Sequence, residues 1–458
     1  MLPRNQNIIA FTAVVAGWAA FTHLYQARAD EPVSTADHLA YNAAQIDRDI
    51  QFHEQRVKRD PTGPIGWRML SAAYLVRASE SDSTEAARKA EAAARRSLSL
   101  RQVSNAAAAT TLVQALLAQH RFSEALTESE NAIVLEPENP HAIQQHAEVL
   151  LEVGKYSEAK ACIDARRSAF DTPTGRLVAA RMLEIEGKPD IALRMIRQSL
   201  DEADASSGVD ARTLAFFHGR LGTTLATAAR WTEAETEFKA DLALYPRDYR
   251  ALAGLTRLYA LESRTTDVLH YGAMTQEVAP MADVEGLLGD AELALGHHAK
   301  AEKHYATVAV LAGTPSGDAA GRMLTGSSTH GHRLDRQYAM FCADHHRDLD
   351  GAYAAALRDL QLRRDIYGLD TLAWVCYQRG EIHEADLASR QALSHGTQDP
   401  RLWLHAGIIQ AKVGNAVEAR RRLEMVKILD PSITTTLNQQ ASIALTALPI
   451  SVMKGDSK

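Results

Sequence analysis

The sequence predicts an all-α fold in which helix-turn-helix repeats stack into a solenoid. The chain has 458 residues, of which 46% are hydrophobic and only 6% aromatic, and alanine occurs in runs such as the one from Ala106 to Ala109. No stretch alternates apolar and polar residues as half-buried strands do. The chain is also similar to itself at a fixed offset, so that Ala125 and Ala159, or Pro246 and Pro280, take equivalent places. Composition therefore excludes an all-β fold and disfavours an α/β fold, and the repeat predicts a stacked array.

The N-terminal segment, residues 1–29, has the pattern of an export signal. A short positive region at Arg4 precedes an apolar run over residues 8–21, and Ala27 and Ala29 stand at the spacing of a small-x-small cleavage site. We expect cleavage after Ala29, so that this segment is absent from the mature protein.

An uncleaved anchor is the alternative to a cleaved signal. The uncharged stretch over residues 5–27 is long enough to cross a bilayer as a helix, and residues 8–25 would then associate with the membrane. In both cases the body is expected on the exported side, because positive charge precedes the apolar run and Asp30 and Glu31 follow it. The expected location is therefore periplasmic or otherwise exported, with or without an anchor in the inner membrane.

The charge balance disfavours nucleic acid as a partner. Removing residues 1–29 takes away Arg4 and Arg28, and it leaves 48 basic and 57 acidic side chains, a formal balance of −9. No basic stripe stands out, whereas nucleic-acid binding draws on clustered lysine and arginine.

The three cysteines, Cys162, Cys342 and Cys376, are an odd number for an exported chain, so they form no complete disulfide framework. Cys342 and Cys376 are separated by one period of the repeat. They either bridge neighbouring repeats or fill the same small apolar slot in each. The second interpretation is favoured, because equivalent positions on successive stacked helices are expected to lie beyond the roughly 7 Å Cα separation that a disulfide allows.

The internal repeat becomes visible when the chain is aligned with itself at an offset of about 34 residues. The clearest segments begin at Ala106, Pro140, Ala215, Tyr249, Ile366 and Pro400. An alanine of the second helix recurs as Ala125, Ala159, Ala234, Ala385 and Ala419, and a proline closes the unit as Pro137, Pro246, Pro280 and Pro431. Glycine marks the turn between the helices at Gly154, Gly380 and Gly414. With weaker copies included, ten units extend over residues 64–433.

The pattern inside each unit resembles the tetratricopeptide repeat (TPR). Its first helix carries marks such as Leu221-Gly222, Leu372-Ala373 and Ala406-Gly407, where a small residue allows the two helices of a hairpin to approach closely. The resemblance implies a right-handed α-solenoid that binds protein partners. The carboxyl portion, in residues 343–348, 370–374 and 405–407, also resembles exported bacterial proteins with many such repeats.

The same patterns divide the chain into six segments. They are a signal peptide or membrane anchor (1–29), a leading polar segment with a capping helix (30–63), an N-terminal TPR array (64–312), a glycine-rich linker (313–331), C-terminal TPR units (332–433), and a capping helix with a tail (434–458). The linker is the expected hinge between the two arrays, and the caps are expected because terminal repeats otherwise expose apolar surface.

No catalytic or metal-binding constellation stands out. The chain has no Gly-x-Ser-x-Gly motif preceded by a strand and no phosphate-binding glycine loop, so it is not predicted to be an enzyme or to need a cofactor. Two metal ligands could converge at His330 and His332, but histidines in a solvated loop are the favoured interpretation. No metal site is predicted.

In the resembled family, the first helices of the units form a concave wall. The resemblance assigns to the partner-binding site Arg333, Arg336, Met340, Tyr367, Asp370, Trp374, Tyr377 and Arg401, and it adds His141, Gln144, Glu148, Arg250, Arg257 and Asp344 to the wall. Arginine and large aromatic residues dominate the energy of protein interfaces, so the carboxyl groove is the expected site for a partner peptide or protein. The alternative is that Trp374 and Tyr377 only pack within the array.

The expected function is that of a non-enzymatic interaction scaffold or adaptor on the exported side of a bacterial membrane. The alternative is an accessory subunit of an envelope assembly or secretion machine that serves polysaccharide, pilus or outer-membrane biogenesis. The partner is expected to be a protein or peptide of unknown identity, because wall residues vary independently of the repeat that carries them.

Overall fold

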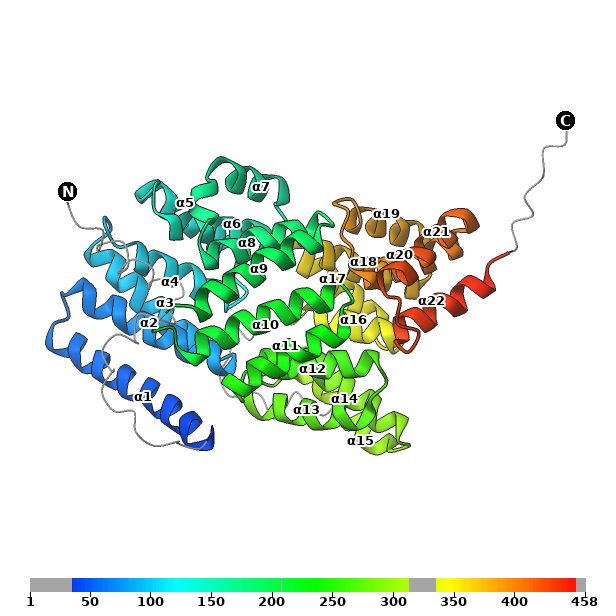
Figure 1. Cartoon of the computed structure of the whole chain (residues 1–458), viewed down its shortest axis with the longest axis horizontal. Coiled ribbons are helices and arrows are strands. Elements are labelled where there is room, and N and C mark those ends of the chain that lie inside the picture. Colours follow the sequence, from blue (N-terminus) through cyan, green and yellow to red (C-terminus); the bar gives the residue numbers. More distant parts are fainter. Residues whose placement is uncertain (1–34, 207, 313–334, 450–458) are drawn as a thin grey trace.

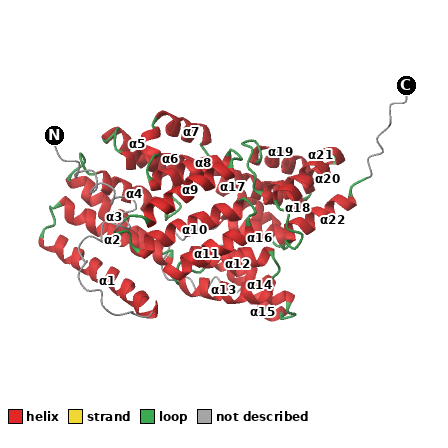
Figure 2. Ribbon diagram, in the orientation of Figure 1, coloured by secondary structure: helices red, strands yellow, loops and turns green. Residues whose placement is uncertain are grey.

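The protein is all-α, as the sequence predicts. The computed structural model describes residues 35–206, 208–312 and 335–449 (Figure 1). Within these residues the chain forms 22 α-helices and a short 3₁₀ helix, joined by loops (Figure 2). Twenty of the α-helices pack as ten consecutive helical hairpins, with extensive contact between helices that are neighbours in the chain. The prediction of a stacked array of helix pairs is therefore confirmed.

The helix pairs follow one another from residue 64 to residue 429. They are α2 (Pro64–Ser81) with α3 (Thr84–Leu100), α4 (Ala106–Leu117) with α5 (Phe122–Leu135), α6 (Pro140–Glu152) with α7 (Tyr156–Ala165), α8 (Pro173–Ile185) with α9 (Pro189–Asp204), and α10 (Ala211–Thr227) with α11 (Trp231–Leu244). Then come α12 (Tyr249–Leu261) with α13 (Thr265–Val278), α14 (Ala282–Ala294) with α15 (His298–Leu311), α16 (Asp335–Asp344) with α17 (Leu349–Leu362), α18 (Ile366–Arg379) with α19 (Ile382–Ala392), and α20 (Pro400–Val413) with α21 (Ala416–Leu429).

Three further elements flank or interrupt the pairs. Helix α1 (Thr35–Arg59) packs on α2 at the amino end, and α22 (Thr436–Ala447) packs on α20 and α21 at the carboxyl end. The 3₁₀ helix η4 (Arg167–Phe170) lies between α7 and α8. The interruption near residues 201–210 is shorter than the sequence indicates, because α9 continues to Asp204.

Small residues hold the two helices of a pair close together. A Cβ atom placed on Gly222 of α10 would lie 2.8 Å from the ring of Phe238 on α11, and one placed on Gly407 of α20 would lie 2.7 Å from the Leu423 side chain on α21. Both separations are well inside van der Waals contact, so each pair depends on a missing side chain at this position.

Side-chain caps fix where several first helices begin. The carboxylates of Asp210, Asp248, Asp365 and Asp399 each accept a hydrogen bond from a backbone N–H in the first turn of the helix that follows. Such caps satisfy amide groups that have no partner within the helix.

The array winds back upon itself, so that pairs distant in sequence come into contact. The backbone N–H of Ile366 donates to the hydroxyl of Tyr156 over 3.0 Å, and the N–H of Arg364 donates to the carbonyl of Val153 over 3.1 Å. These bonds join the turn of the α6–α7 pair to the start of the α18–α19 pair, six pairs further along. Figure 1 accordingly shows the C-terminal helices lying beside α6 to α8.

Equivalent contacts occur on either side of this one. Near the amino end, Glu80 at the end of α2 pairs with Arg212 over 2.7 Å and accepts a hydrogen bond from the Tyr245 hydroxyl over 2.8 Å. Near the carboxyl end, Trp231 bonds to Asp430, just before α22. One superhelical turn therefore takes four to six pairs, and the solenoid is wound tightly enough for consecutive turns to touch.

The predicted linker and terminal segments lie outside the described residues. This applies to residues 1–29 and to the glycine-rich stretch over 313–331. The pairs on either side of that stretch contact each other directly, since the rings of Tyr305 on α15 and Phe341 on α16 lie 5.4 Å apart. Among the described residues, no helix combines the length and apolar character needed to cross a bilayer.

Candidate functional site

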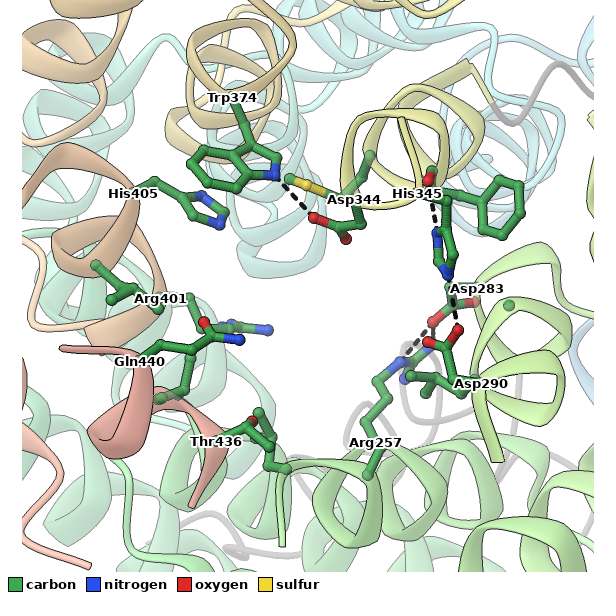
Figure 3. A pocket seen from close by; sticks show the side chains of 18 of the residues that line it. Arg257, Asp283, Asp290, Asp344, His345, Trp374, Arg401, His405, Thr436 and Gln440 are labelled. Carbon is green, nitrogen blue, oxygen red and sulfur yellow. Dashed lines mark hydrogen bonds and ion pairs between the residues drawn. The ribbon is translucent and has the colours of Figure 1, made fainter. Parts of the chain in front are cut away.

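A cavity of about 920 Å³ lies inside the C-terminal turn of the superhelix (Figure 3). Five first helices contribute to its wall: α12, α14, α16, α18 and α20. Helix α22 adds Thr436, Leu437 and Gln440 on the side where the ring of first helices would otherwise be open. The concave wall is therefore completed into a ring, and its volume falls in the range typical of ligand-binding pockets.

Neighbouring first helices are joined across the cavity wall by pairs that contain an aspartate. Arg257 on α12 pairs with Asp283 on α14, and its guanidinium NH2 lies 2.6 Å from the carboxylate. His345, directly after α16, pairs with Asp290 on α14 through its Nε2 atom over 2.7 Å. The wall is thus fastened by polar contacts that face the cavity.

The same arrangement continues along the next two helices. The indole Nε1 of Trp374 on α18 donates to Asp344 on α16 over 2.7 Å, and Nδ1 of His405 on α20 lies 2.9 Å from the Asp370 carboxylate on α18. Four successive contacts of this kind hold five helices in register. The side chains that line the cavity are therefore held on rigid elements.

The indole of Trp374 stacks with two other rings. His405 stacks on the indole with ring centroids 4.3 Å apart and planes inclined by 12°, and Tyr377 stacks on it at 5.0 Å and 8°. Trp374 and His405 border the cavity, whereas Tyr377 is not among its lining residues. Tyr377 therefore contacts Trp374 without bordering the cavity.

Charges around the cavity shift the titration of its histidines. Burial alone would lower the pKa of His405, but the Asp370 carboxylate outweighs it and the pKa is raised. Burial also acts to lower the pKa of His345, but the hydrogen bond and charge of Asp290 outweigh it and raise that pKa as well. Both rings consequently hold a proton more readily than a solvated histidine does.

The pKa of Asp344 is raised, whereas the pKa of an ion-paired carboxyl group is lowered. Burial raises its pKa, although the charge of His405 and the hydrogen bond from Trp374 act against the shift. Its side chain is nevertheless accessible, because it faces the cavity (Figure 3). Asp344 is thus a carboxylate in a recess that favours its neutral form.

Two predicted site arginines are already neutralised by carboxylates. Arg336 contacts Asp359 over 2.7 Å and Asp365 over 2.8 Å. Arg401 pairs with Asp399, whose carboxylate is fully buried and also caps α20. Arg336 therefore ties α16 to α17 and to the start of α18, and it presents little free charge to a ligand. Nothing in the repeat pattern of the sequence indicates these partners.

The structure brings most of the predicted site residues together. Those lining the cavity are Arg336, Met340, Tyr367, Asp370, Trp374 and Arg401, together with the predicted wall residues Arg257 and Asp344. Arg333 lies outside the described residues. Gln144 does not face the cavity: it is buried and its amide donates to the Ala169 carbonyl of η4, because the 3₁₀ turn fills the space beside α6.

Several lining residues were not predicted. Thr436 and Gln440 belong to α22, which was expected only to cover the end of the array, and Asp290 and His345 lie beyond the wall positions of the resembled family. The adjacency of Asp344 and His345 in the sequence could have indicated that His345 lines the cavity, because two neighbouring polar side chains at a helix end can both point into one cavity.

No group of three or more histidine, cysteine, aspartate or glutamate side chains in the described part of the chain has a geometry that could hold a metal ion. His330 and His332 lie outside that part. The three cysteines are free, and Cys342 and Cys376 are both buried, in agreement with the interpretation that they fill equivalent apolar slots.

Comparison with known proteins gives similarity to solved structures only. No protein-family model matches the chain, and no curated protein does. The structure of the anaphase-promoting complex hetero-tetramer Cut9–Hcn1 is similar over 90% of this chain and 97% of that one, with 13% identity and a TM-score of 0.32.

Two further solved structures are similar over shorter parts of the chain. A tetratricopeptide repeat protein from Parabacteroides merdae covers 57% of this chain and 93% of its own, with 15% identity and a TM-score of 0.36. PilW, described as a type IV pilus biogenesis factor, covers 45% and 93%, with 19% identity and a TM-score of 0.36. At these identities the likeness concerns the general fold alone.

Proposed function

We propose that this protein is a non-enzymatic interaction scaffold that binds a segment of a partner protein in the cavity of its C-terminal turn. The observation that carries the proposal is the ring of five first helices, fastened by polar contacts and lined by Trp374, His405 and Tyr367. Aromatic side chains held in fixed orientations supply large contact area at little cost in conformational entropy. A segment inserted between them would bury apolar surface and meet the polar groups of the wall.

The completed ring limits what the cavity can accept. Thr436 and Gln440 of α22 lie across the cavity from Asp344 and His345 (Figure 3). This arrangement favours a short extended segment or a chain end over a long helix laid along an open groove. We therefore propose that the partner contributes a few residues to the cavity and makes its other contacts on the outer surface.

The proposed place of action is the exported side of a bacterial membrane. The pattern of residues 1–29 and the acidic balance of the remaining chain support this location. A direct check is fractionation of cells that produce the full chain. Recovery of the protein with the cytoplasmic fraction, uncleaved, would contradict the proposal.

The cavity itself is tested by filling it. Gln440 of α22 lines the cavity and is exposed to it, whereas its neighbour Gln439 does not line it and bonds instead to the Ile433 and Thr434 carbonyls. Gln440→Trp should block partner binding, and Gln439→Trp on the same helix is the matched control.

The measurement is affinity capture from envelope extracts with quantitative mass spectrometry. A partner that the wild type and Gln439→Trp retain equally, and that Gln440→Trp loses, supports the proposal. Equal retention by all three proteins, with unchanged melting temperatures, would show that the partner binds elsewhere.

A further inference from the structure

Asp344 is the one cavity-lining aspartate that has no cationic partner among the described residues. Its carboxylate projects into the cavity from the last residue of α16 (Figure 3). Its hydrogen-bond donor is the neutral indole N–H of Trp374. Ion pairs of the neighbouring helices do not include it.

The other charged groups of the wall are matched locally. Asp283 has Arg257, Asp290 has His345, and Asp370 has His405. The arginines are matched as well, since Arg336 and Arg401 each contact one or two carboxylates outside the cavity lining. The cations of the described lining are therefore engaged by other carboxylates, and Asp344 is the lining carboxylate left without an ion pair of its own.

The position of Asp344 is unfavourable for an anion on three separate grounds. It ends a helix, where the backbone dipole disfavours negative charge. The recess around it is poorly solvated, which raises its pKa. The carboxylate of Asp290 also raises that pKa, and the charges of His405 and His345 and the hydrogen bond from Trp374 oppose the shift without cancelling it. A cation brought into the cavity would relieve all three costs at once.

The surroundings of Asp344 suit a basic side chain with an apolar stem. Met340 lies one turn earlier on α16, and Phe341 and Tyr367 also line the cavity. Lysine and arginine pack their methylene stems on apolar and aromatic surface while the charged head meets a carboxylate. The aromatic stack of Trp374 and His405 fixes the direction in which that carboxylate points.

We propose that Asp344 is the anchor for a lysine or arginine side chain that the partner segment inserts into the cavity. The inference rests on the proposed function, because it names the chemistry of the segment that the same cavity accepts. It adds that a basic residue is the determinant of recognition, and that binding weakens with increasing salt.

Defined probes test the anchor without knowledge of the partner. N-acetyl-lysine methylamide and N-acetyl-arginine methylamide carry the two cationic heads, and N-acetyl-norleucine methylamide is the uncharged counterpart. Titration of the full chain with each probe, followed by NMR or calorimetry, should give binding of one or both basic probes and at least about tenfold weaker binding of the norleucine probe, which corresponds to loss of one charge-assisted contact.

Asp344→Asn preserves the shape of the side chain and its acceptor for Trp374 while removing the charge. It should weaken the basic probes about tenfold or more and leave the norleucine probe unchanged. Asp201→Asn, an exposed position on α9, removes the same charge far from the cavity and should have no effect. Unchanged affinity of Asp344→Asn for both basic probes would overturn the proposal, as would equal binding of all three probes to the wild type.

Met340→Lys provides a second variant that does not depend on the stability of Asp344→Asn. It places an ammonium one helical turn from Asp344, where it can neutralise the carboxylate internally. The expected result is an unchanged or higher melting temperature together with loss of the basic probes. Wild-type affinity of Met340→Lys for these probes would also count against the anchor.

The two proposals fail in distinguishable ways. If a captured partner is lost by Gln440→Trp but retained fully by Asp344→Asn, the cavity binds the partner and the anchor is wrong. If Gln440→Trp retains the partner, the cavity itself is the wrong site.

Discussion

The indole Nε1 of Trp231 donates a hydrogen bond to Oδ1 of Asp430 over 2.9 Å, although the two residues are 199 positions apart in sequence. Trp231 begins α11, and Asp430 follows α21. The Asp430 carboxylate is fully buried and also accepts a hydrogen bond from the Thr435 hydroxyl. This contact joins the fifth helix pair to the segment that leads into α22, which completes the ring around the cavity.

Trp231→Phe should destabilise the fold by about 1.5–3 kcal/mol, because it leaves a buried carboxylate without one of its donors. The measurement is equilibrium unfolding in urea. Trp67→Phe is the matched control, since the Trp67 indole donates to the exposed Pro61 carbonyl near the amino end. If both variants lose the same free energy of unfolding, the buried bond of Trp231 to Asp430 stabilises the fold no more than the exposed bond of Trp67 does.

The turn glycines should fall into two classes. Gly154 and Gly187 both have positive φ, and a Cβ atom on them would lie 2.2 Å from the Arg364 carbonyl oxygen and 2.0 Å from the Gly396 carbonyl oxygen, respectively. Gly414 also has positive φ, but nothing lies within 4 Å of its Cβ position. Gly414→Ala should therefore cost only about 1 kcal/mol for the left-handed backbone, and Gly154→Ala should cost clearly more.

Small-angle scattering adds a check that is specific to the contact between turns. Gly154→Ala and Gly187→Ala should increase the radius of gyration, because the C-terminal pairs are pushed off α6 to α8, whereas Gly414→Ala should not. Identical unfolding energies and dimensions for all three variants would refute this assignment.

Stability gained from the two wall histidines should decrease as the pH rises. Burial acts to lower the folded-state pKa of His345 and His405, but Asp290 and Asp370 outweigh it and raise both pKa values. The contribution is therefore complete below the unfolded pKa of about 6.5 and is lost as the pH passes through the folded pKa. His405→Gln should thus lower the melting temperature most near pH 5.5–6 and least near pH 9. The exposed His383 serves as the control, and a difference that grows toward alkaline pH would contradict the expectation.

Asp241 on α11 should act as a destabilising acid near neutral pH. It is 1% exposed, its Oδ1 atom has no hydrogen-bond partner among the described residues, and burial together with Asp248 raises its pKa to about 9. The folded state holds this proton while the unfolded state releases it near pH 4, so stability falls as the pH rises from about 4 to 9.

Asp241→Asn should remove that cost. At pH 7–8 it should raise the free energy of unfolding by on the order of a few kcal/mol, and it should flatten the dependence of stability on pH. Urea titrations at several pH values provide the measurement. A variant that is less stable than the wild type at pH 8 would show that the carboxyl group has a stabilising partner.

Processing of the amino terminus gives a test of the export signal. Cleavage after Ala29 should yield a mature chain that begins at Asp30 when the full sequence is produced in a bacterial host. Intact-mass measurement distinguishes this product from the full-length chain. A full-length chain recovered with membranes supports the anchor, and a full-length chain in the cytoplasm argues against both alternatives.

The sequence allowed the local architecture to be predicted and left the global one undetermined. Alanines such as Ala125 and Ala234 recur at the same place in their repeats because each pair meets its neighbour in the same way. The resemblance to the tetratricopeptide repeat then assigns Trp374 and Asp370 to the inner wall, where both line the cavity. Contacts between turns leave no such periodic mark. They depend on small rotations that accumulate over several pairs, so the bonds of Tyr156 to Ile366 and of Trp231 to Asp430 were not foreseeable.

The candidate site shows the same division. The wall positions of Met340 and Trp374 follow from the repeat, whereas the neutralisation of Arg336 by Asp359 and Asp365 depends on a helix and a cap outside the first-helix pattern. The part played by α22 was missed because a terminal helix can either cover the last pair or reach across to the previous turn. Its sequence alone does not distinguish these two outcomes.

The contacts between successive turns of the superhelix, made at Tyr156, Gly187 and Trp231, also constrain how the number of repeats in this chain can change. In an open solenoid, duplication or loss of one repeat extends or shortens the rod and disturbs only two neighbours. Here the Arg364 amide bonds to the Val153 carbonyl across two turns of the superhelix. Adding a helix pair between these two residues would shift every later pair by one position relative to the pair that it now contacts in the preceding turn. The number of helix pairs in one turn therefore cannot change without breaking the contacts between turns. Insertions should be tolerated in the loops between helices but not as whole hairpins.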